Sequence, residues 1–331
     1  MVKKVLKIVL IVVIALILIF VLYFFVGKAK GVSKVEWGIT FSKKYAIDLG
    51  LDWQQVFSVM LYDLGVKRIR LIAYWDDIEK EQGEYDFTDL DWQMKNTEQK
   101  EIDVVLAVGR RLPRWPECFV PEWAGGLPEE EKQEHILSFI SKTINRYKGY
   151  DNISIWQIEN EPFLGFFGDC PKVDKKFLEE EIALAKDLDD RPVMITESGE
   201  FSTWIGGARR ADIVGSSLYR KIYGKLKIYF TYPIPPIFYQ RKASLIKSLF
   251  KVDEIIAIEV QAEPWGHKAT QDMTVEEQDI SMSFEQFNKV LEYTRKAGFS
   301  KAYLWGAEWW YWRMNKFGDD SFWNKARDIL Q

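Results

Sequence analysis

Short apolar segments alternate with longer helical patterns along most of the chain, and this alternation constrains the fold more than any other feature. Strands that alternate with helices pair in parallel, because each helix returns the chain to the same end of the sheet. The pattern predicts an α/β fold, a (β/α)8 TIM barrel spanning residues 35–331. The eight candidate strands are Glu36–Phe41, Arg68–Ala73, Asp103–Val108, Ile153–Ile158, Pro192–Thr196, Ala211–Ser216, Glu254–Val260 and Ala302–Trp305.

The intervals between these strands carry helical patterns, for example at Asp52–Leu64, Glu130–Tyr147 and Met282–Ala297. Gly65 and Gly298 follow two of these helices, at the position where a helix commonly ends in a left-handed residue. No Gly/Ser or Pro tract divides the body, so we expect a single domain. In such barrels the active site lies at the carboxyl ends of the strands.

The amino terminus carries an apolar run from Val5 to Val26 whose single charge is Lys7. At helical rise this run is long enough to cross the hydrocarbon core of a bilayer. A cleavable signal peptide is the alternative, but its apolar region is shorter and ends in small residues, whereas this run ends in Tyr23-Phe24-Phe25. We therefore expect a short cytoplasmic N-terminus (1–4), a transmembrane signal anchor (5–26) and a linker (27–34).

Lysines lie on both sides of this span, and Lys3, Lys4 and Lys7 stand at its start. Their closeness to the span favours an inside N-terminus and an exported body. Removing these three charges from the formal net charge of −4 leaves −7, which argues against a nucleic-acid partner. The expected location is the cell membrane, in a single-pass arrangement with the barrel outside the cytoplasm.

Two cysteines and two histidines are too few for a disulfide framework or a histidine-based metal site, so we expect no metal and no cofactor. Cys118 follows the third predicted strand and Cys170 the fourth, which places both in adjacent loops at one end of the barrel. In an exported protein this pair is a candidate disulfide. The alternative is that the two thiols are not linked. As a separate expectation, the protein is a monomer.

The fourth predicted strand ends in Glu159-Asn160-Glu161-Pro162. Here the sequence resembles the glycoside hydrolases of clan A, whose fourth strand ends in Asn-Glu-Pro and whose seventh strand ends in a second Glu. The resemblance implies that Glu161 is the general acid/base and that Asn160 holds the 2-hydroxyl of a sugar. Such an acid needs a raised pKa, from a neighbouring carboxylate or an apolar wall. Alternatively, Glu159 and Glu161 are rim residues paired with Arg or Lys.

Two glutamates near the end of the seventh predicted strand compete for the role of nucleophile. Glu259 follows the apolar run directly and matches the family's strand-end position, while Glu263 falls four residues later. We favour Glu259 as the nucleophile and keep Glu263 as the alternative. A third interpretation is that Glu259 only forms a salt bridge. A retaining reaction requires the two carboxyl groups to lie about 5–5.5 Å apart.

The resemblance covers residues 35–312 and implies further substrate-binding residues. Arg70, which precedes Trp75 by five residues, is similar to the second-strand Arg that orients the nucleophile in clan A. Tyr219 matches an aromatic that contacts the nucleophile, and Trp305 matches a ring that floors a sugar subsite. Sugars stack on aromatic rings, so the candidate set is completed by Trp115 in a loop similar to the family's sugar-facing loop, by Trp265 and by the rim carboxylate Glu308.

Two basic features depart from the family pattern or lie outside it. Arg110 and Arg111 follow the third strand, where they either recognise an acidic sugar or pair with Glu117 or Glu122. The segment 220–251 contains eight Lys or Arg and no Asp or Glu. It is either a membrane-facing or cleft-extending insertion, or a long loop and helix with a solvated basic face.

These features predict a retaining glycoside hydrolase that cleaves a β-linked oligo- or polysaccharide by double displacement, so the expected partners are a carbohydrate substrate and the membrane. One alternative is a catalytically silent barrel that binds a glycan or a partner at the cell surface. Another is a transglycosylase, which would use the same residues with a different acceptor.

Overall fold

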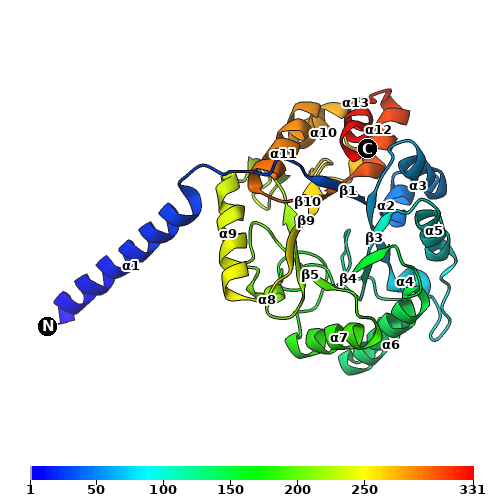
Figure 1. Cartoon of the computed structure of the whole chain (residues 1–331), viewed down its shortest axis with the longest axis horizontal. Coiled ribbons are helices and arrows are strands. Elements are labelled where there is room, and N and C mark those ends of the chain that lie inside the picture. The colour runs from blue at the N-terminus through cyan, green and yellow to red at the C-terminus, as the bar shows by residue number, and fades with distance from the viewer. Residues whose placement is uncertain (1) are drawn as a thin grey trace.

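Eight parallel strands close into a barrel in the computed structural model, which describes residues 2–331. The order around the barrel is β1-β10-β9-β6-β5-β4-β3-β2, and helices surround it (Figure 1). The predicted fold class is confirmed, and the strand ends differ from the predicted ones by at most two residues. The strands are β1 (Glu36–Thr40), β2 (Arg68–Ala73), β3 (Asp103–Val108), β4 (Ile153–Ile158), β5 (Val193–Glu197), β6 (Ile213–Leu218), β9 (Glu254–Gln261) and β10 (Lys301–Trp305).

The barrel strands are continuous apolar runs because both of their faces are covered. In β3, for example, Val104 and Leu106 belong to the layer between the barrel and the helices, while Val105 belongs to the barrel interior. The interior cluster also contains Ile155, Met194, Ile213, Ile256, Ile258 and Tyr303. These apolar side chains fill the interior at one end of the barrel. The polar side chains of the strands lie at the opposite, carboxyl-terminal end.

The helices connect successive strands, and polar side chains cap the start of α2, α3, α7, α10 and α11. Asp52 accepts hydrogen bonds from the backbone of Gln54 and Gln55 at the start of α3, and Gly298 ends α11 in the left-handed region (φ 89°). The helices of the body are α2 (Lys43–Asp48), α3 (Trp53–Tyr62), α4 (Trp75–Ile78), α5 (Thr88–Gln99), α6 (Glu129–Tyr147), α7 (Lys175–Leu188), α8 (Ile205–Ala208), α9 (Pro236–Leu249), α10 (Val275–Met282), α11 (Phe284–Ala297), α12 (Ala307–Phe317) and α13 (Ser321–Leu330).

The segment between β6 and β9 holds a small element that was not predicted. Strands β7 (Lys221–Tyr223) and β8 (Tyr229–Thr231) pair in antiparallel fashion to form a hairpin, and α9 follows it. The basic segment 220–251 therefore consists of a hairpin and a helix.

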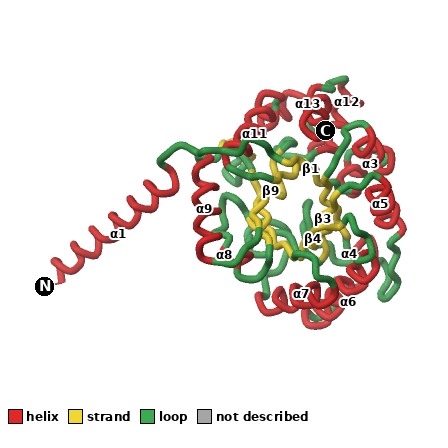
Figure 2. Tube along the Cα trace, in the orientation of Figure 1, coloured by secondary structure: helices red, strands yellow, loops and turns green. Residues whose placement is uncertain are grey.

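Helix α1 (Val2–Phe25) extends away from the barrel beside α9 (Figures 1 and 2). It has 24 residues, a mean hydropathy of 3.5 and no buried residue, so it is long and apolar enough to cross a membrane. Its carboxyl-terminal end contacts α9, where the Phe238 ring lies 5.6 Å from Phe24 and 5.4 Å from Phe25. Arg241 of α9 also donates a hydrogen bond to the carbonyl of Leu22 (3.1 Å).

Candidate active site

The chain turns sharply after β4, and this turn positions Glu161. Both Glu159 (φ 57°) and Glu161 (φ 43°) adopt left-handed backbone conformations, which non-glycine residues rarely do. The turn is fixed by a hydrogen bond from the Glu161 backbone N–H to Oγ1 of Thr196 on β5 (2.7 Å). Strained backbone of this kind persists where the surrounding structure holds it, commonly at active sites.

The side chain of Glu161 is buried and lies among other carboxylates. Burial raises the pKa of Glu161 well above its ordinary value, and the charges of Glu259 and Glu117 raise it further. Within residues 2–331, its Oε1 atom has no hydrogen-bond partner. A carboxyl group in this setting retains its proton to a higher pH than an exposed one, and it has an oxygen available to deliver that proton.

Glu259 on β9 lies in a different setting, because both of its oxygens accept hydrogen bonds. The hydroxyl of Tyr219 donates to Oε1 (2.6 Å), and Nη2 of Arg70 donates to Oε2 (3.0 Å). Arg70 is itself fully buried on β2 and is fixed by a hydrogen bond to Oγ1 of Thr40 (3.0 Å). A guanidinium and a phenol hydroxyl together stabilise an ionised carboxylate.

Glu161 and Glu259 line one cavity of about 100 Å³ at the mouth of the barrel, together with Glu117, Tyr219 and Trp265. Its remaining wall consists of Leu164, Phe166, Phe167, Ser198, Glu200, Phe201, Ser217, Ile222 and Tyr232. Most of these residues come from the loops that follow β4, β5 and β6, as expected for the functional end of a barrel.

Glu117 is a third buried carboxylate in this cavity, and sequence reasoning considered it only as a partner of the arginine pair. Its Oε2 accepts hydrogen bonds from Nε (2.8 Å) and Nη2 (2.6 Å) of Arg111. Burial raises the pKa of Glu117 to about 7, against the opposing effect of Arg111. Glu117 is therefore partly charged near neutral pH and adds to the field that Glu161 experiences.

Glu200, one of the residues that line the cavity, supports Tyr219 through contacts that were not predicted. Oε1 of Glu200 accepts hydrogen bonds from the backbone N–H of Tyr219 (2.8 Å) and from the hydroxyl of Tyr239 (2.7 Å). Lys242, one helical turn beyond Tyr239 on α9, donates to the carbonyl of Gly199 (2.9 Å). Burial lowers the pKa of Lys242 to about 7. The spacing of Tyr239, Lys242 and Ile246 on one face of a helix was the available indication that this face is turned inward.

Glu263, the alternative nucleophile, belongs to a different cluster. Both of its oxygens are paired with the guanidinium of Arg114, and it is not among the described residues that line the cavity. Arg114 also lies 3.6 Å from Glu308, and its guanidinium carbon lies 3.7 Å from the ring centroid of Tyr45 and 3.9 Å from that of Trp305. Burial raises the pKa of Glu308 to about 7.

The other predicted residues lie in varied positions. Asn160 is buried next to Glu161 in the chain, and its Oδ1 accepts a hydrogen bond from Oγ1 of Thr196 (3.1 Å). Trp265 packs edge-on against Tyr219, with ring centroids 5.0 Å apart. Trp115 lies on the rim with 63% of its surface exposed.

Trp75 does not face the cleft, contrary to the sequence prediction. Its ring is fully buried between the barrel and the helices, against Trp123 and Phe139, and its Nε1 donates to Oε2 of Glu79 (2.6 Å). The reason is that α4 begins at Trp75, directly after Tyr74. The chain leaves the barrel rim at this point, and the indole points away from the cleft toward the surrounding helices.

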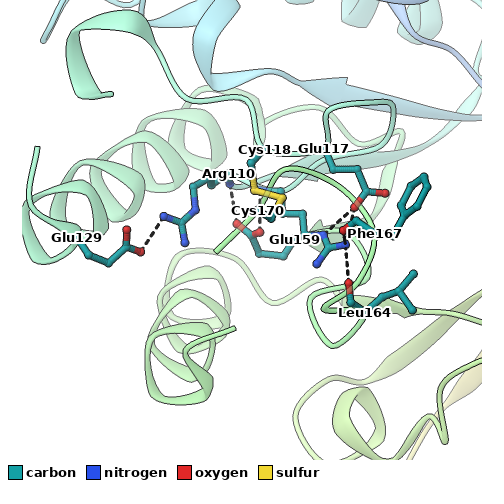
Figure 3. The surroundings of a disulfide bond; sticks show 9 residues. Arg110, Glu117, Cys118, Glu129, Glu159, Leu164, Phe167 and Cys170 are labelled. Carbon is teal, nitrogen blue, oxygen red and sulfur yellow. Dashed lines mark hydrogen bonds and ion pairs between the residues drawn. A yellow bond between two sulfur atoms is a disulfide. The ribbon is translucent and has the colours of Figure 1, made fainter. Parts of the chain in front are cut away.

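Cys118 and Cys170 form a disulfide that joins the loops after β3 and β4, with their Cα atoms 5.4 Å apart (Figure 3). Beside it, Glu159 accepts hydrogen bonds from the backbone N–H groups of Arg110 (2.6 Å) and Arg111 (2.8 Å). The two arginine side chains are engaged in ion pairs, Arg111 with Glu117 and Arg110 with Glu129 (Figure 3). This agrees with the ion-pair reading of Arg111, whereas Arg110 has a partner that was not predicted.

Nothing in the described chain, residues 2–331, groups three or more His, Cys, Asp or Glu side chains in a way that could hold a metal ion. The side chains at the site supply carboxylates, a phenol and a guanidinium.

No protein-family model and no curated protein matches the sequence. Solved structures do match the fold. An endo-β-1,4-xylanase of glycoside hydrolase family 10 from Gloeophyllum trabeum superposes with a TM-score of 0.57 and 14% identity, covering 90% of this chain and 96% of the xylanase. GH5_18 from Streptomyces cattleya, solved with GlcNAc, gives a TM-score of 0.56 and 12% identity over 83% of this chain and 71% of that one.

A β-galactosidase from the Antarctic haloarchaeon Halorubrum lacusprofundi gives a TM-score of 0.53 and 13% identity, and 82% of this chain covers 52% of it. The chain thus spans about half the length of such β-galactosidases. These structural neighbours are clan A glycosidases, and the chain has their barrel fold.

Proposed function

We propose that this barrel is a retaining glycoside hydrolase that cleaves a β-linked oligo- or polysaccharide, with Glu161 as acid/base and Glu259 as nucleophile. The observation that carries the proposal is the contrast between two glutamates of one cavity. Glu161 has a raised pKa and an oxygen without a hydrogen-bond partner among residues 2–331, whereas both oxygens of Glu259 accept hydrogen bonds from Arg70 and Tyr219. One proton donor and one nucleophilic carboxylate are the two groups that double displacement requires.

In the first step, Glu161 donates its proton to the glycosidic oxygen while an oxygen of Glu259 attacks the anomeric carbon. The bond to the leaving group breaks, and a covalent glycosyl-enzyme forms. In the second step, Glu161 takes a proton from water, the water oxygen attacks the anomeric carbon, and Glu259 is released as a carboxylate. Arg70 and Tyr219 hold Glu259 throughout, and Asn160 is the proposed partner of the 2-hydroxyl.

We propose that the chain is divided into a cytoplasmic N-terminus (1–4), a membrane-spanning anchor (5–26), a linker (27–34) and a catalytic domain (35–331). The apolar, unburied α1 supports the anchor. The disulfide between Cys118 and Cys170 supports an exported barrel, because disulfides persist in oxidising compartments.

The test is a panel of p-nitrophenyl β-glycosides, which identifies the sugar, followed by variants of the two glutamates. We expect Glu161→Gln to lower kcat by about 10²–10⁴-fold on a sugar with a poor leaving group. Glu259→Gly should be inactive and should regain turnover with azide, which gives the inverted glycosyl azide. A 2-fluoro sugar should label Glu259.

Glu263→Gln is the matched control, because it changes a second glutamate of the same loop region outside the cavity. Loss of activity in Glu263→Gln with full activity in Glu259→Gln would show that the nucleophile is misassigned. Glycan binding without turnover of any sugar in the panel would instead favour the catalytically silent barrel.

A further inference from the structure

The catalytic cavity opens onto an exposed apolar surface, which we name the lip and define as Phe166, Phe201, Leu226, Ile228 and Phe230. Phe166 and Phe201 follow β4 and β5, and the other three residues belong to the β7–β8 hairpin. Phe166, Phe201, Leu226 and Ile228 are 56%, 55%, 83% and 55% exposed. Grouped apolar side chains at this level of exposure mark a binding surface more often than chance packing.

The lip is continuous with the cavity through a chain of aromatic contacts. Phe166 and Phe201 have ring centroids 5.3 Å apart, Phe201 and Tyr232 are 5.5 Å apart, and Tyr232 and Phe230 are 5.0 Å apart. Phe166, Phe201 and Tyr232 also line the cavity that contains Glu161. A molecule on the lip can therefore extend directly to the proposed proton donor.

The cavity lining includes polar side chains, among them Ser198, Glu200, Ser217 and Tyr232, but five of its fourteen side chains are purely hydrocarbon. These five are Leu164, Phe166, Phe167, Phe201 and Ile222, and none of these side chains carries a hydrogen-bonding atom. A sugar ring needs polar partners for its hydroxyls as well as an aromatic face, and polar groups fix ligand orientation in binding sites. Hydrocarbon is the chemistry that this wall would recognise.

Basic residues accompany the lip. Lys225 and Lys227 are exposed in the hairpin turn, and Nζ of Lys225 lies 5.7 Å from the ring centroid of Phe166. The surrounding segment 220–251 has eight Lys or Arg and no Asp or Glu. Apolar side chains mixed with lysine are typical of surfaces that work at a membrane interface.

The same segment contacts the proposed anchor. Helix α9, which follows the hairpin, packs its Phe238 against Phe24 and Phe25 of α1, and Arg241 binds the carbonyl of Leu22. Residues 26–35 alone separate α1 from β1. The proposed anchor would therefore hold the barrel close to the bilayer, where lipid substrates are concentrated.

We infer that the substrate is a glycolipid, whose sugar binds at Glu161 and Glu259 and whose hydrocarbon aglycone lies on the lip. This inference rests on the proposed function and specifies its leaving group. Glu161 would protonate the oxygen that joins sugar to lipid, the bond from that oxygen to the anomeric carbon would break, and the lipid alcohol would leave. Water would then release the sugar from Glu259.

The first test compares methyl and hexyl β-glycosides of the sugar that the panel identifies, with the full-length protein in phosphatidylcholine nanodiscs. Each buried methylene contributes a gain of about fourfold, so partial burial of the hexyl chain should raise kcat/KM by about 10-fold to 100-fold. Phe201→Ser should bring the hexyl-to-methyl ratio toward one. The control Phe284→Ser, a 40% exposed phenylalanine on α11, should leave the ratio unchanged. Equal kcat/KM for both glycosides would overturn the inference and leave the glycosidase assignment intact.

The second test needs no turnover, so it tests binding of the aglycone at the lip separately from the proposed function, even if every sugar in the panel is inert. An octyl β-glucoside with a terminal diazirine is photolysed with the nanodisc-bound protein, and labelled peptides are mapped. Label on 163–168, 200–203 or 222–232 that hexyl glucoside competes away supports the lip as an aglycone site. Label on α1 reports probe in the bilayer. Absence of label on the lip contradicts the inference. Label that hexyl glucoside does not compete away also contradicts it, because a surface that simply inserts into the bilayer would give that result.

Discussion

The guanidinium of Arg114 lies over the indole of Trp305, 3.9 Å from the ring centroid, and the ring of Tyr45 contacts the same guanidinium at 3.7 Å. Trp305 is the residue that the family resemblance assigned to the floor of a sugar subsite. A cation now occupies the place against this ring where a sugar would stack, and Glu263 and Glu308 hold the cation there. A sugar reaches this face of Trp305 only if Arg114 moves, whereas Trp265 already borders the open cavity.

Arg114 is expected to be a strong contributor to stability, because it neutralises two buried glutamates. Arg114→Met leaves Glu263 and Glu308 facing each other without a cation, and loss of one partner from a buried ion pair costs about 3–5 kcal/mol. Denaturant unfolding of the variant and the parent protein measures this loss. The double variant Arg114→Met/Glu263→Gln should lose less, because one uncompensated charge is removed.

The matched control is Arg295→Met, which breaks an exposed pair with Glu292 and should change the unfolding free energy little. If the single Arg114 variant and the double variant lose the same unfolding free energy, Arg114 does not stabilise the protein by compensating Glu263.

Glu117 is expected to tune the pH dependence of catalysis. Glu161 must be protonated to act as an acid, so kcat/KM falls as the pH rises through the pKa of Glu161. The charge of Glu117 raises the pKa of Glu161 after the larger effects of burial and Glu259. Glu117→Gln removes that charge, so the pKa of Glu161 falls and the alkaline limb of kcat/KM moves to lower pH.

Glu129→Gln serves as the control for this measurement, since it removes a carboxylate that pairs with Arg110 on the exposed side of the same loop. A pH profile of Glu117→Gln that coincides with the parent profile would mean that Glu117 exerts no field at Glu161.

The strands could be predicted from the sequence because each barrel strand is covered on both faces and is therefore a continuous apolar run. The family resemblance assigned roles to Glu161 and Glu259, and each of them lies at or near the end of such a run. The orientation of Trp75 could not be predicted in this way, because position at a strand end does not tell whether the next helix turns a side chain inward or outward. Tertiary contacts with Trp123 and Phe139 decide that orientation.

Contacts between distant loops also could not be predicted from the sequence. Arg114 and Glu263 are 149 residues apart, and the pair forms only because the loops after β3 and β9 meet at the barrel mouth. The burial of Lys242 could not be predicted, because the charge of its segment favours solvent exposure. In the structure, its helix places this one lysine inside the protein, behind Glu200.

The disulfide is expected to stabilise the loops that frame the cavity. Cys118 and Cys170 close a segment of 52 residues, and the loss of chain entropy in the unfolded state then stabilises the fold by about 4 kcal/mol in the loop-closure treatment. The Cys118→Ser/Cys170→Ser variant should therefore unfold at lower denaturant concentration. Dithiothreitol should destabilise the parent protein by a similar amount and leave the variant unaffected, whereas a parent protein indifferent to reductant would contradict a structural role.

The final prediction concerns α1, which we propose to be an uncleaved membrane anchor. An arginine at the centre of a spanning helix costs about 2.5 to 3.5 kcal/mol of insertion free energy, so Ile14→Arg/Ile17→Arg should shift the protein from the carbonate-resistant membrane fraction to the soluble fraction. Leu226→Arg, an equally drastic change outside α1, should leave membrane retention unchanged. The mass of the membrane-bound protein should include residues 1–26. Recovery of a soluble protein that lacks them would identify α1 as a cleaved signal peptide.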